Sequence, residues 1–173
     1  MLRLRPPVII DIEASGFGPG SYPIEIGLVR NDGVKYCSLI APVGDWTHWD
    51  EGAEKVHRVT RQILAQHGKP IGEVARALNE MLRACTAYSD GWVVDKPWLN
   101  RLFHAARIPC EFSLSSLECI LSERQMEIWH QTKDELLREL GDHRHRASFD
   151  AFVIQETWQR TWQATTAAAV AAQ

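Results

Sequence analysis

Two carboxylates stand two residues apart in the segment VIIDIEASG, which covers residues 8–16. The run of branched apolar residues predicts a buried strand. Because side chains alternate between the two faces of a strand, Asp11 and Glu13 would point to the same side. Two like charges on a mostly buried strand repel each other and lose hydration. Such a pair needs a cation, which can be a basic side chain, a shared proton or a metal ion.

Two later segments hold carboxylates that could join this pair around a metal ion. Asp95 lies in DGWVVDKPWL, immediately before a predicted helix, and Asp150 lies in DHRHRASFDA, after two histidines. A Mg²⁺ ion takes about six oxygen ligands and usually keeps some of them as water, so a few carboxylates are enough. Each residue also has a simpler interpretation: Asp95 as a helix N-cap, and Asp150 as a first-turn residue that interacts with the helix dipole.

Three segments, in the order that the family shows, resemble the motifs of the DEDDh 3′–5′ exonucleases. DIEASGF resembles the first motif, VVDKPWL the second, and HRASFDA the third, which has the form His-x-Ala-x-x-Asp-Ala. The family includes ribonuclease T, oligoribonuclease and the proofreading subunit of bacterial DNA polymerase III. The chain departs from the family at Asp90 and Gly91, where many relatives have His-Asn, and at Arg58, where relatives often carry Gly.

The resemblance implies a fold, an activity and a set of site residues. The fold would be a ribonuclease H-like mixed β-sheet flanked by helices. The activity would be hydrolysis of phosphodiester bonds from the 3′ end of single-stranded DNA or RNA, with release of nucleoside 5′-monophosphates. Two divalent metal ions, Mg²⁺ or Mn²⁺, would be the cofactors. The implied metal ligands are Asp11, Glu13, Asp95 and Asp150. The implied substrate contacts are Ala14, Ser15, Gly16, Phe17 and His57.

Either of two histidines could be the general base that takes a proton from the attacking water. On a continuous helix, His143 precedes Asp150 by seven residues and shares its face, whereas His145 precedes Asp150 by five. The stretch GDHRHR has the composition of a loop that enters the helix, which weakens this argument. The spacing of the family motif selects His145, and Arg144 or Arg146 could then meet a phosphate.

The apolar periodicity predicts a single α/β domain in which a mixed sheet is covered by helices. Strands are expected over residues 6–15, on both sides of a turn at residues 31–33, and over residues 85–90. Helices are expected over residues 71–84, 95–107, 116–140 and 147–163, with a short helix near 53–57 and a turn over 60–66. An exonuclease domain over residues 1–163 would be followed by an Ala-rich tail, 164–173, that extends the last helix or frays.

The charge balance and the cysteines limit the class of protein. With 19 Lys and Arg against 22 Asp and Glu, the net charge of −3 argues against wrapping of long duplex DNA. It allows a site whose acidic charge is cancelled by bound cations. Four scattered cysteines predict reduced thiols, and no segment approaches the ~20 apolar residues of a membrane span. We therefore expect a cytoplasmic protein. The partners that the family resemblance implies are the 3′ ends of single-stranded nucleic acid, and a homodimer is one possible oligomeric state.

Several interpretations remain open. Glu25 could face the site from a neighbouring strand or face solvent, and His57 could pack in the protein instead of touching substrate. Trp46 and Trp49 could stack on bases, although packing in the core is favoured. Two other functions fit the same motifs: hydrolysis of very short oligonucleotides, as in oligoribonuclease, and nucleic-acid binding without catalysis.

Overall fold

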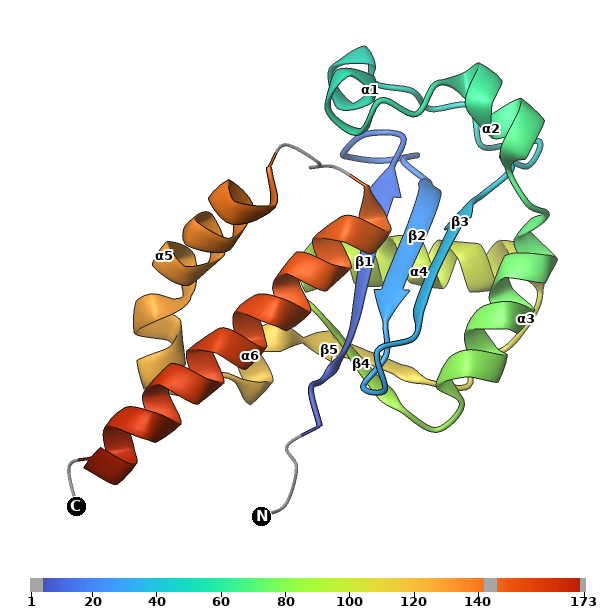
Figure 1. Cartoon of the computed structure of the whole chain (residues 1–173). Helices are drawn as coiled ribbons and strands as arrows, with labels where there is room; N and C mark the ends of the chain where they lie inside the picture. Colours follow the sequence, from blue (N-terminus) through green and yellow to red (C-terminus); the bar gives the residue numbers. More distant parts are fainter. Residues whose placement is uncertain (1–4, 142–145, 172–173) are drawn as a thin grey trace.

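The computed structural model describes residues 5–141 and 146–171 of the 173-residue chain, with side chains described up to residue 167. At its centre is a five-stranded sheet in the order β3-β2-β1-β4-β5 (Figure 1). The strands are β1 (Val8–Ala14), β2 (Pro23–Val29), β3 (Lys35–Leu39), β4 (Thr86–Ser89) and β5 (Ser113–Ser116). The first three strands pair antiparallel, whereas β4 and β5 run parallel to β1. The sheet is therefore mixed, which confirms the predicted fold class.

Helices cover both faces of this sheet. In Figure 1, α4 lies behind the strands with α3 beside it, and α6 crosses the front with α5 beside it. The helices are α1 (Glu51–His57), α2 (Arg61–His67), α3 (Ile71–Leu82), α4 (Trp92–Ala106), α5 (Glu123–Leu140) and α6 (Ala147–Ala171). None of the helices in the described part of the chain has the length and apolar character needed to cross a membrane.

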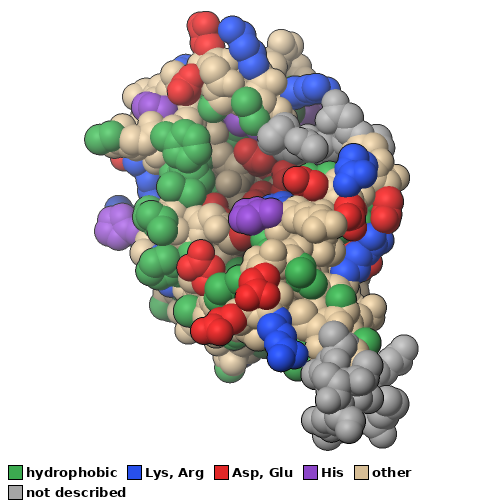
Figure 2. Space-filling model, turned by 90° about the vertical axis from the view of Figure 1, so that its left-hand side faces the viewer, with side chains coloured by type: hydrophobic (Ala, Val, Ile, Leu, Met, Phe, Trp, Pro, Cys, Tyr) green, Lys and Arg blue, Asp and Glu red, His purple; other side chains and the backbone are tan. Residues whose placement is uncertain are grey.

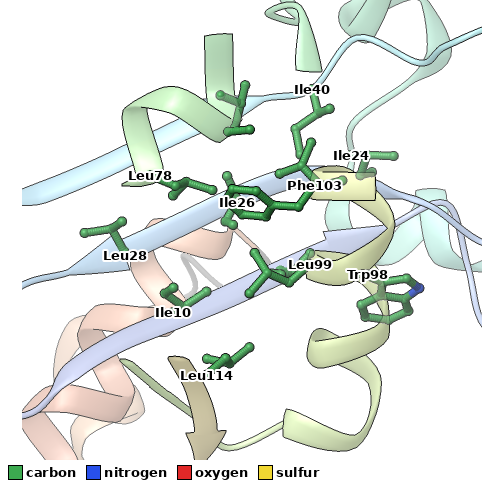
Figure 3. Packing of buried hydrophobic residues seen from close by; sticks show 14 of the residues in the cluster. Ile10, Ile24, Ile26, Leu28, Ile40, Leu78, Trp98, Leu99, Phe103 and Leu114 are labelled. Carbon is green, nitrogen blue, oxygen red and sulfur yellow. The ribbon is translucent and has the colours of Figure 1, made fainter. Parts of the chain in front are cut away.

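The alternation of side chains along β1 divides the core into two clusters. Ile10 packs with Leu78 of α3 and Leu99 of α4 on one face of the sheet (Figure 3). Ile9 packs on the other face, where Ile154 of α6 covers it. The odd-numbered side chains of β1 therefore point toward α6.

Two segments differ from the sequence-based expectation because local polar groups determine their structure. The helix expected over residues 116–140 is wrong at its start: residues 113–116 form the edge strand β5, and α5 begins at Glu123. Ser122 caps α5 in a capping box with Gln125. The expected turn over residues 60–66 is instead α2, whose first turn is capped by the hydroxyl of Thr60.

Two other helices have different bounds from those expected. α4 begins at Trp92, three residues early, so Asp95 lies in the first turn of the helix and not before it. α6 continues through Ala171, so residues 164–171 extend the last helix, which was one of the two alternatives for the Ala-rich tail.

The start of α6 lies directly against β2 at Gly27. Gly27 pairs with Asp11 across the β1–β2 ladder. A Cβ atom at position 27 would overlap the backbone of Ala147 and Ser148, so only glycine allows this close approach. The distance between α6 and β1 therefore depends on this residue.

We expect Gly27→Ala to lower the free energy of unfolding by about 2–3 kcal/mol, because the added methyl group must push α6 away from the sheet. Chemical denaturation measures this loss. Gly44→Ala is the matched control, since its Cβ would have no neighbour within 4 Å, and we expect a change within about 0.5 kcal/mol. Equal stabilities of the two variants would contradict the close-packing interpretation.

Candidate active site

The two carboxylates of β1 lie on the face of the sheet that α6 covers. Asp11 pairs with Gly27 and Glu13 pairs with Glu25 in the antiparallel ladder. The regular register ends between Glu13 and Ala14, where the strand has an irregularity of the β-bulge type. The structure thus confirms that Asp11 and Glu13 point to the same side.

A third carboxylate reaches this pair from α6. Asp150 lies in the first turn of that helix, where its backbone N–H donates to the carbonyl oxygen of Arg146 over 3.0 Å. Asp11, Glu13 and Asp150 each offer a carboxylate oxygen, and the three oxygens lie within 4.8 Å of one another. Residues separated by more than 130 positions in the sequence are therefore brought within the reach of one metal ion.

Asp95 lies in the same cavity, on the α4 side. It is not part of the group of three carboxylates within 4.8 Å. Its carboxylate accepts a hydrogen bond from the hydroxyl of Ser89, the last residue of β4. Gly91 occupies the N-cap position of α4 and no side chain caps this helix, so the N-cap interpretation of Asp95 is wrong.

Burial, together with the charges of neighbouring carboxylates, raises the pKa values of Asp11, Glu13 and Asp95. Asp11 is surrounded by protein although part of its surface stays accessible, and the resulting loss of hydration raises its pKa well above 3.8. The negative charge of Asp95, and after it those of Glu13 and Asp150, raise this pKa further. Burial, followed by the charges of Asp150 and Glu25, raises the pKa of Glu13 from 4.5 to about 7. Burial also raises the pKa of Asp95 to about 7, although the hydrogen bond from Ser89 opposes this rise.

The donor set fits a divalent cation. Among the described residues that line the cavity there is no Lys or Arg to balance Asp11, Glu13, Asp95 and Asp150. Carboxylate oxygens are the ligands that Mg²⁺ and Mn²⁺ prefer. Because unbalanced carboxylates in a buried site are costly, the arrangement is the one expected of a binding site for cations.

Glu25, the residue opposite Glu13, is in contrast fully neutralised. Its side chain is completely buried. It accepts hydrogen bonds from Nε of Arg146 at 3.0 and 3.1 Å, from Nη2 of Arg146 at 2.6 Å, and from the backbone N–H of Ala147 at 3.1 Å. The expected solvent-facing alternative for Glu25 is therefore wrong. This residue joins β2 to the first turn of α6, and Arg146 is engaged with it.

The carboxylates form the floor of a cavity of about 560 Å³. Figure 2 shows the hollow on this face of the molecule, with acidic side chains (red) inside it and hydrophobic side chains (green) along one rim. Phe17 is 72% exposed at the cavity wall and its ring lies 5.9 Å from that of Trp98 in α4. Val56 of α1 is also exposed in the wall.

The predicted substrate contacts divide into two groups. Ala14, Gly16, Phe17 and His57 line the cavity. Ser15 is completely buried and does not line it.

Ser15 instead holds the loop that follows β1. Its hydroxyl accepts from the backbone N–H of Tyr22 at 3.1 Å and lies 3.0 Å from Nδ1 of His48. Its carbonyl oxygen accepts from the backbone N–H of Asp50 at 2.8 Å. The neighbouring Gly16 has a φ of +133° and faces the side chains of His48 and Asp50 so closely that a Cβ would not fit. Ser15 and Gly16 therefore set the shape of the cavity wall.

His57 packs within the protein and also lines the cavity. It is buried at the end of α1, and its Nδ1 accepts a hydrogen bond from the backbone N–H of Val59 at 3.1 Å. Its ring also meets the edge of Trp49, with ring centroids 6.1 Å apart. Because Nδ1 is an acceptor, a neutral His57 carries its proton on Nε2.

The two candidates for the general base, His143 and His145, lie outside the described residues. Arg146, which follows His145 directly, is fixed by Glu25.

Sequence reasoning missed three residues that support the cavity: His48, Ser89 and Asp50. Each acts through a hydrogen bond to a residue distant in the sequence or at the end of another element. Of these three residues, Ser89 alone could have been noticed in the sequence. It is a polar residue at the end of a predicted strand, a few positions before the predicted site residue Asp95.

No protein-family model matches the sequence, and no curated protein has a matching sequence. Solved structures do match the fold. Escherichia coli Exonuclease I in complex with a dA16 oligonucleotide is 14% identical over 84% of this chain and 38% of that chain, with a TM-score of 0.64. The zinc-bound E. coli ExoI–ssDNA complex is 13% identical over 89% and 39%, with a TM-score of 0.65.

Exonuclease I from Methylocaldum szegediense is 14% identical over 74% of this chain and 30% of that chain, with a TM-score of 0.54. The chain thus spans less than half of the length of these exonucleases. At this level of identity the similarity establishes the fold, and it confirms the ribonuclease H-like sheet that the motifs predicted.

Arg146→Ala should lower the free energy of unfolding by about 3 kcal/mol, because it leaves the buried carboxylate of Glu25 without its counter-charge. Urea denaturation measures this loss, and Glu25→Gln in the Arg146→Ala background should recover part of it. Arg30→Ala is the control, since Arg30 pairs over 3.0 Å with the exposed Asp32 and its loss should cost less than about 1 kcal/mol. Equal losses in Arg146→Ala and Arg30→Ala would contradict this assignment.

In chelator, the stability of the wild-type protein should fall as the pH rises through 7. The pKa values of Glu13 and Asp95 are raised from 4.5 and 3.8 to about 7, so between these limits the folded chain binds more protons than the unfolded chain. Thermal denaturation from pH 5 to pH 8 measures this dependence. Stability that rises with pH across this window would contradict the raised pKa values.

Proposed function

We propose that this chain is a metal-dependent 3′–5′ exonuclease that acts on single-stranded DNA or RNA. The observation that carries the proposal is the group formed by Asp11, Glu13 and Asp150 in a cavity without a balancing basic side chain among the described residues. The order of the three motifs and the fold shared with Exonuclease I support it.

Asp11, Glu13, Asp95 and Asp150 are the proposed ligands of two Mg²⁺ or Mn²⁺ ions. Such a pair of ions, when bound, stabilises the attacking and leaving oxygens of an in-line displacement at phosphorus. Asp11 is the proposed shared ligand, because the charges of Asp95, Glu13 and Asp150 all act on it. The hydroxyl of Ser89 would keep the carboxylate of Asp95 oriented toward the cavity.

The chain's own residues would position the terminal nucleotide. The exposed ring of Phe17, supported by Trp98, offers a surface on which any base can stack, with about 1–3 kcal/mol for each stacked base. The cavity volume of about 560 Å³ suits one nucleotide better than a duplex end. These features support release of one nucleotide at a time without sequence preference, and nucleoside 5′-monophosphates are the products that the motif resemblance implies.

His145 is the proposed general base, on the basis of its place in the motif HRASFDA. A neutral imidazole can accept the proton of the attacking water near neutral pH. The bidentate contact between Glu25 and Arg146 supports this role indirectly, because it fixes the chain at the residue that follows His145.

Purified protein with Mn²⁺ or Mg²⁺ should shorten a 5′-labelled single-stranded oligonucleotide one nucleotide at a time. Asp11→Asn and Asp150→Asn should lower the rate of cleavage by more than about 100-fold. Substitution of a residue that only hydrogen-bonds to a metal ligand already lowers metal affinity or activity about 10–100-fold. Denaturing gels measure the ladder, and a chelator should abolish it. The same substitutions should weaken the increase in melting temperature that Mn²⁺ causes in the wild-type protein.

His143 provides the control for the assignment of His145 as the general base. His145→Ala should lower kcat while leaving the Mn²⁺-induced thermal shift intact, whereas His143→Ala should do much less. Internal cleavage without a ladder would count against an exonuclease. A rate that is highest on two to five nucleotides would favour an oligoribonuclease-like hydrolase, and binding without turnover under several metals would favour a silent binding module.

A further inference from the structure

The described residues that line the catalytic cavity offer carboxylates and apolar surface to a nucleic-acid strand, and no Lys or Arg is among them. Two basic side chains near it are paired with carboxylates: Arg146 with Glu25 at 2.6 Å, and Lys133 with Asp90 at 2.7 Å. Contacts with phosphate oxygens provide much of the affinity of proteins for nucleic acid. Apart from the proposed metal ions, the described lining gives such a strand no basic side chain, and cationic contacts further along the surface would add to its affinity.

A second hollow, which we call the α4 groove, supplies such contacts. It has a volume of about 530 Å³ and lies between α4 and the loop of residues 43–46. Two arginines, Arg101 and Arg107, line it together with His104, and Asp45 is its only carboxylate among the described residues. His104 and Arg107 are exposed, and neither arginine forms a salt bridge within the described part of the chain.

The α4 groove follows the catalytic cavity along the same helix. Trp98, Arg101 and Ala105 stand at positions i, i+3 and i+7, so they form one stripe of α4. Trp98 lines the catalytic cavity, whereas Arg101 and Ala105 line the α4 groove. The rise of about 1.5 Å per residue places the backbone of Arg101 about 9 Å from that of Asp95 along the helix axis.

A short loop links the two hollows on their outer side. Phe17 lies against Trp98 at the catalytic cavity. A few residues later, the hydroxyl of Ser21 accepts from the indole N–H of Trp98 at 2.9 Å, and its carbonyl oxygen accepts from Nη1 of Arg101 at 2.9 Å. A strand that stacks its terminal base on Phe17 can thus pass over this loop to Arg101.

Arg101 is held in place before any ligand binds. Its guanidinium lies over the ring of Trp46, 5.7 Å from the ring centroid, and Trp46 stacks on Tyr22 with centroids 5.2 Å apart. A planar cation fixed in this way loses little side-chain freedom on binding, and it can both stack on a base and donate to a phosphate.

Two other hollows lack an excess of cations. The hollow beside α5 has Lys133 with Asp90 and Glu118 in its wall. The hollow beside α1 has Lys55 and Arg61, but also Glu51 and Glu54. Of these surfaces, the α4 groove has the charge that suits an anionic backbone.

We infer that the α4 groove binds the phosphate backbone of the single strand on the 5′ side of the nucleotide in the catalytic cavity. This inference rests on the proposed function and specifies its substrate as a strand longer than the cavity alone can hold. Arg101 and Arg107 contact phosphates, and their contribution depends on salt but not on sequence.

The test measures binding of a 5′-labelled dT12 to the whole chain by fluorescence anisotropy, in chelator so that no cleavage occurs, from 50 to 200 mM NaCl. Arg107→Gln should flatten the slope of log K against log salt concentration by about 0.7, and Arg101→Gln with Arg107→Gln by about 1.4. Because Arg107 is exposed, its variant keeps the fold even if Arg101→Gln does not. Arg83→Gln, outside both hollows, is the control and should keep the wild-type slope.

A second readout separates the groove from the catalytic site. With Mn²⁺, Arg107→Gln should lower kcat/KM on dT12 by about 3–10-fold and leave kcat/KM on dT3 unchanged. A wild-type slope and an unchanged kcat/KM in Arg107→Gln, or no binding of dT12 by the wild-type chain, would overturn the groove while leaving the proposed function intact. Groove-dependent binding without cleavage would instead overturn the proposed function alone.

Discussion

Burial of several mutually repelling carboxylates at the carboxyl end of β1 is the constraint around which the described structure is arranged. Two of them, Glu13 and Asp95, have pKa values raised to about 7. Each unit of such a shift corresponds to about 1.4 kcal/mol, so together they amount to several kcal/mol, against a total stability of about 5–15 kcal/mol for an ordinary domain. A fold that keeps these groups together at neutral pH has to offset their charge with bound protons or with a cation. It also needs rigid elements to hold them while the cation is absent.

The contrast between Glu13 and Glu25 shows how the fold provides that rigidity. The two glutamates face each other across the β1–β2 ladder, yet only Glu25 has a cationic side chain bound to it. Arg146 neutralises Glu25 and lowers the pKa of Glu13, while the N–H of Ala147 adds a bond from the start of α6. Glu25 thus serves as the structural carboxylate. Together with the close approach at Gly27, it sets the position from which Asp150 reaches Asp11.

Features of this site that depend on neighbouring residues in the sequence could be predicted, whereas features that depend on residues far apart in the sequence could not. Alternation along one strand is local, so the common orientation of Asp11 and Glu13 could be predicted directly. The motif HRASFDA predicted Asp150 as a site residue, and the structure brings this residue to Asp11 and Glu13. The burial of Glu25 could not be predicted, because its partner Arg146 is 121 residues away in the sequence and brought near only by the fold. The strand β5 was missed because SLSS is short and polar, and its place depends on pairing with β4.

The distribution of cations also explains how one small domain could combine a strongly acidic site with an anionic substrate. Basic side chains close to the carboxylates would compete with metal ions for them, and two described ones near the cavity, Arg146 and Lys133, are paired with Glu25 and Asp90 instead. Arg101 and Arg107 stand further along α4, where the carboxylates of the cavity are not among the lining groups. In the proposed exonuclease, this separation would let metal ions meet the terminal phosphate while the arginines meet the rest of the strand. The length of α4, which carries Asp95 in its first turn and Arg107 at its end, sets the distance between these two tasks.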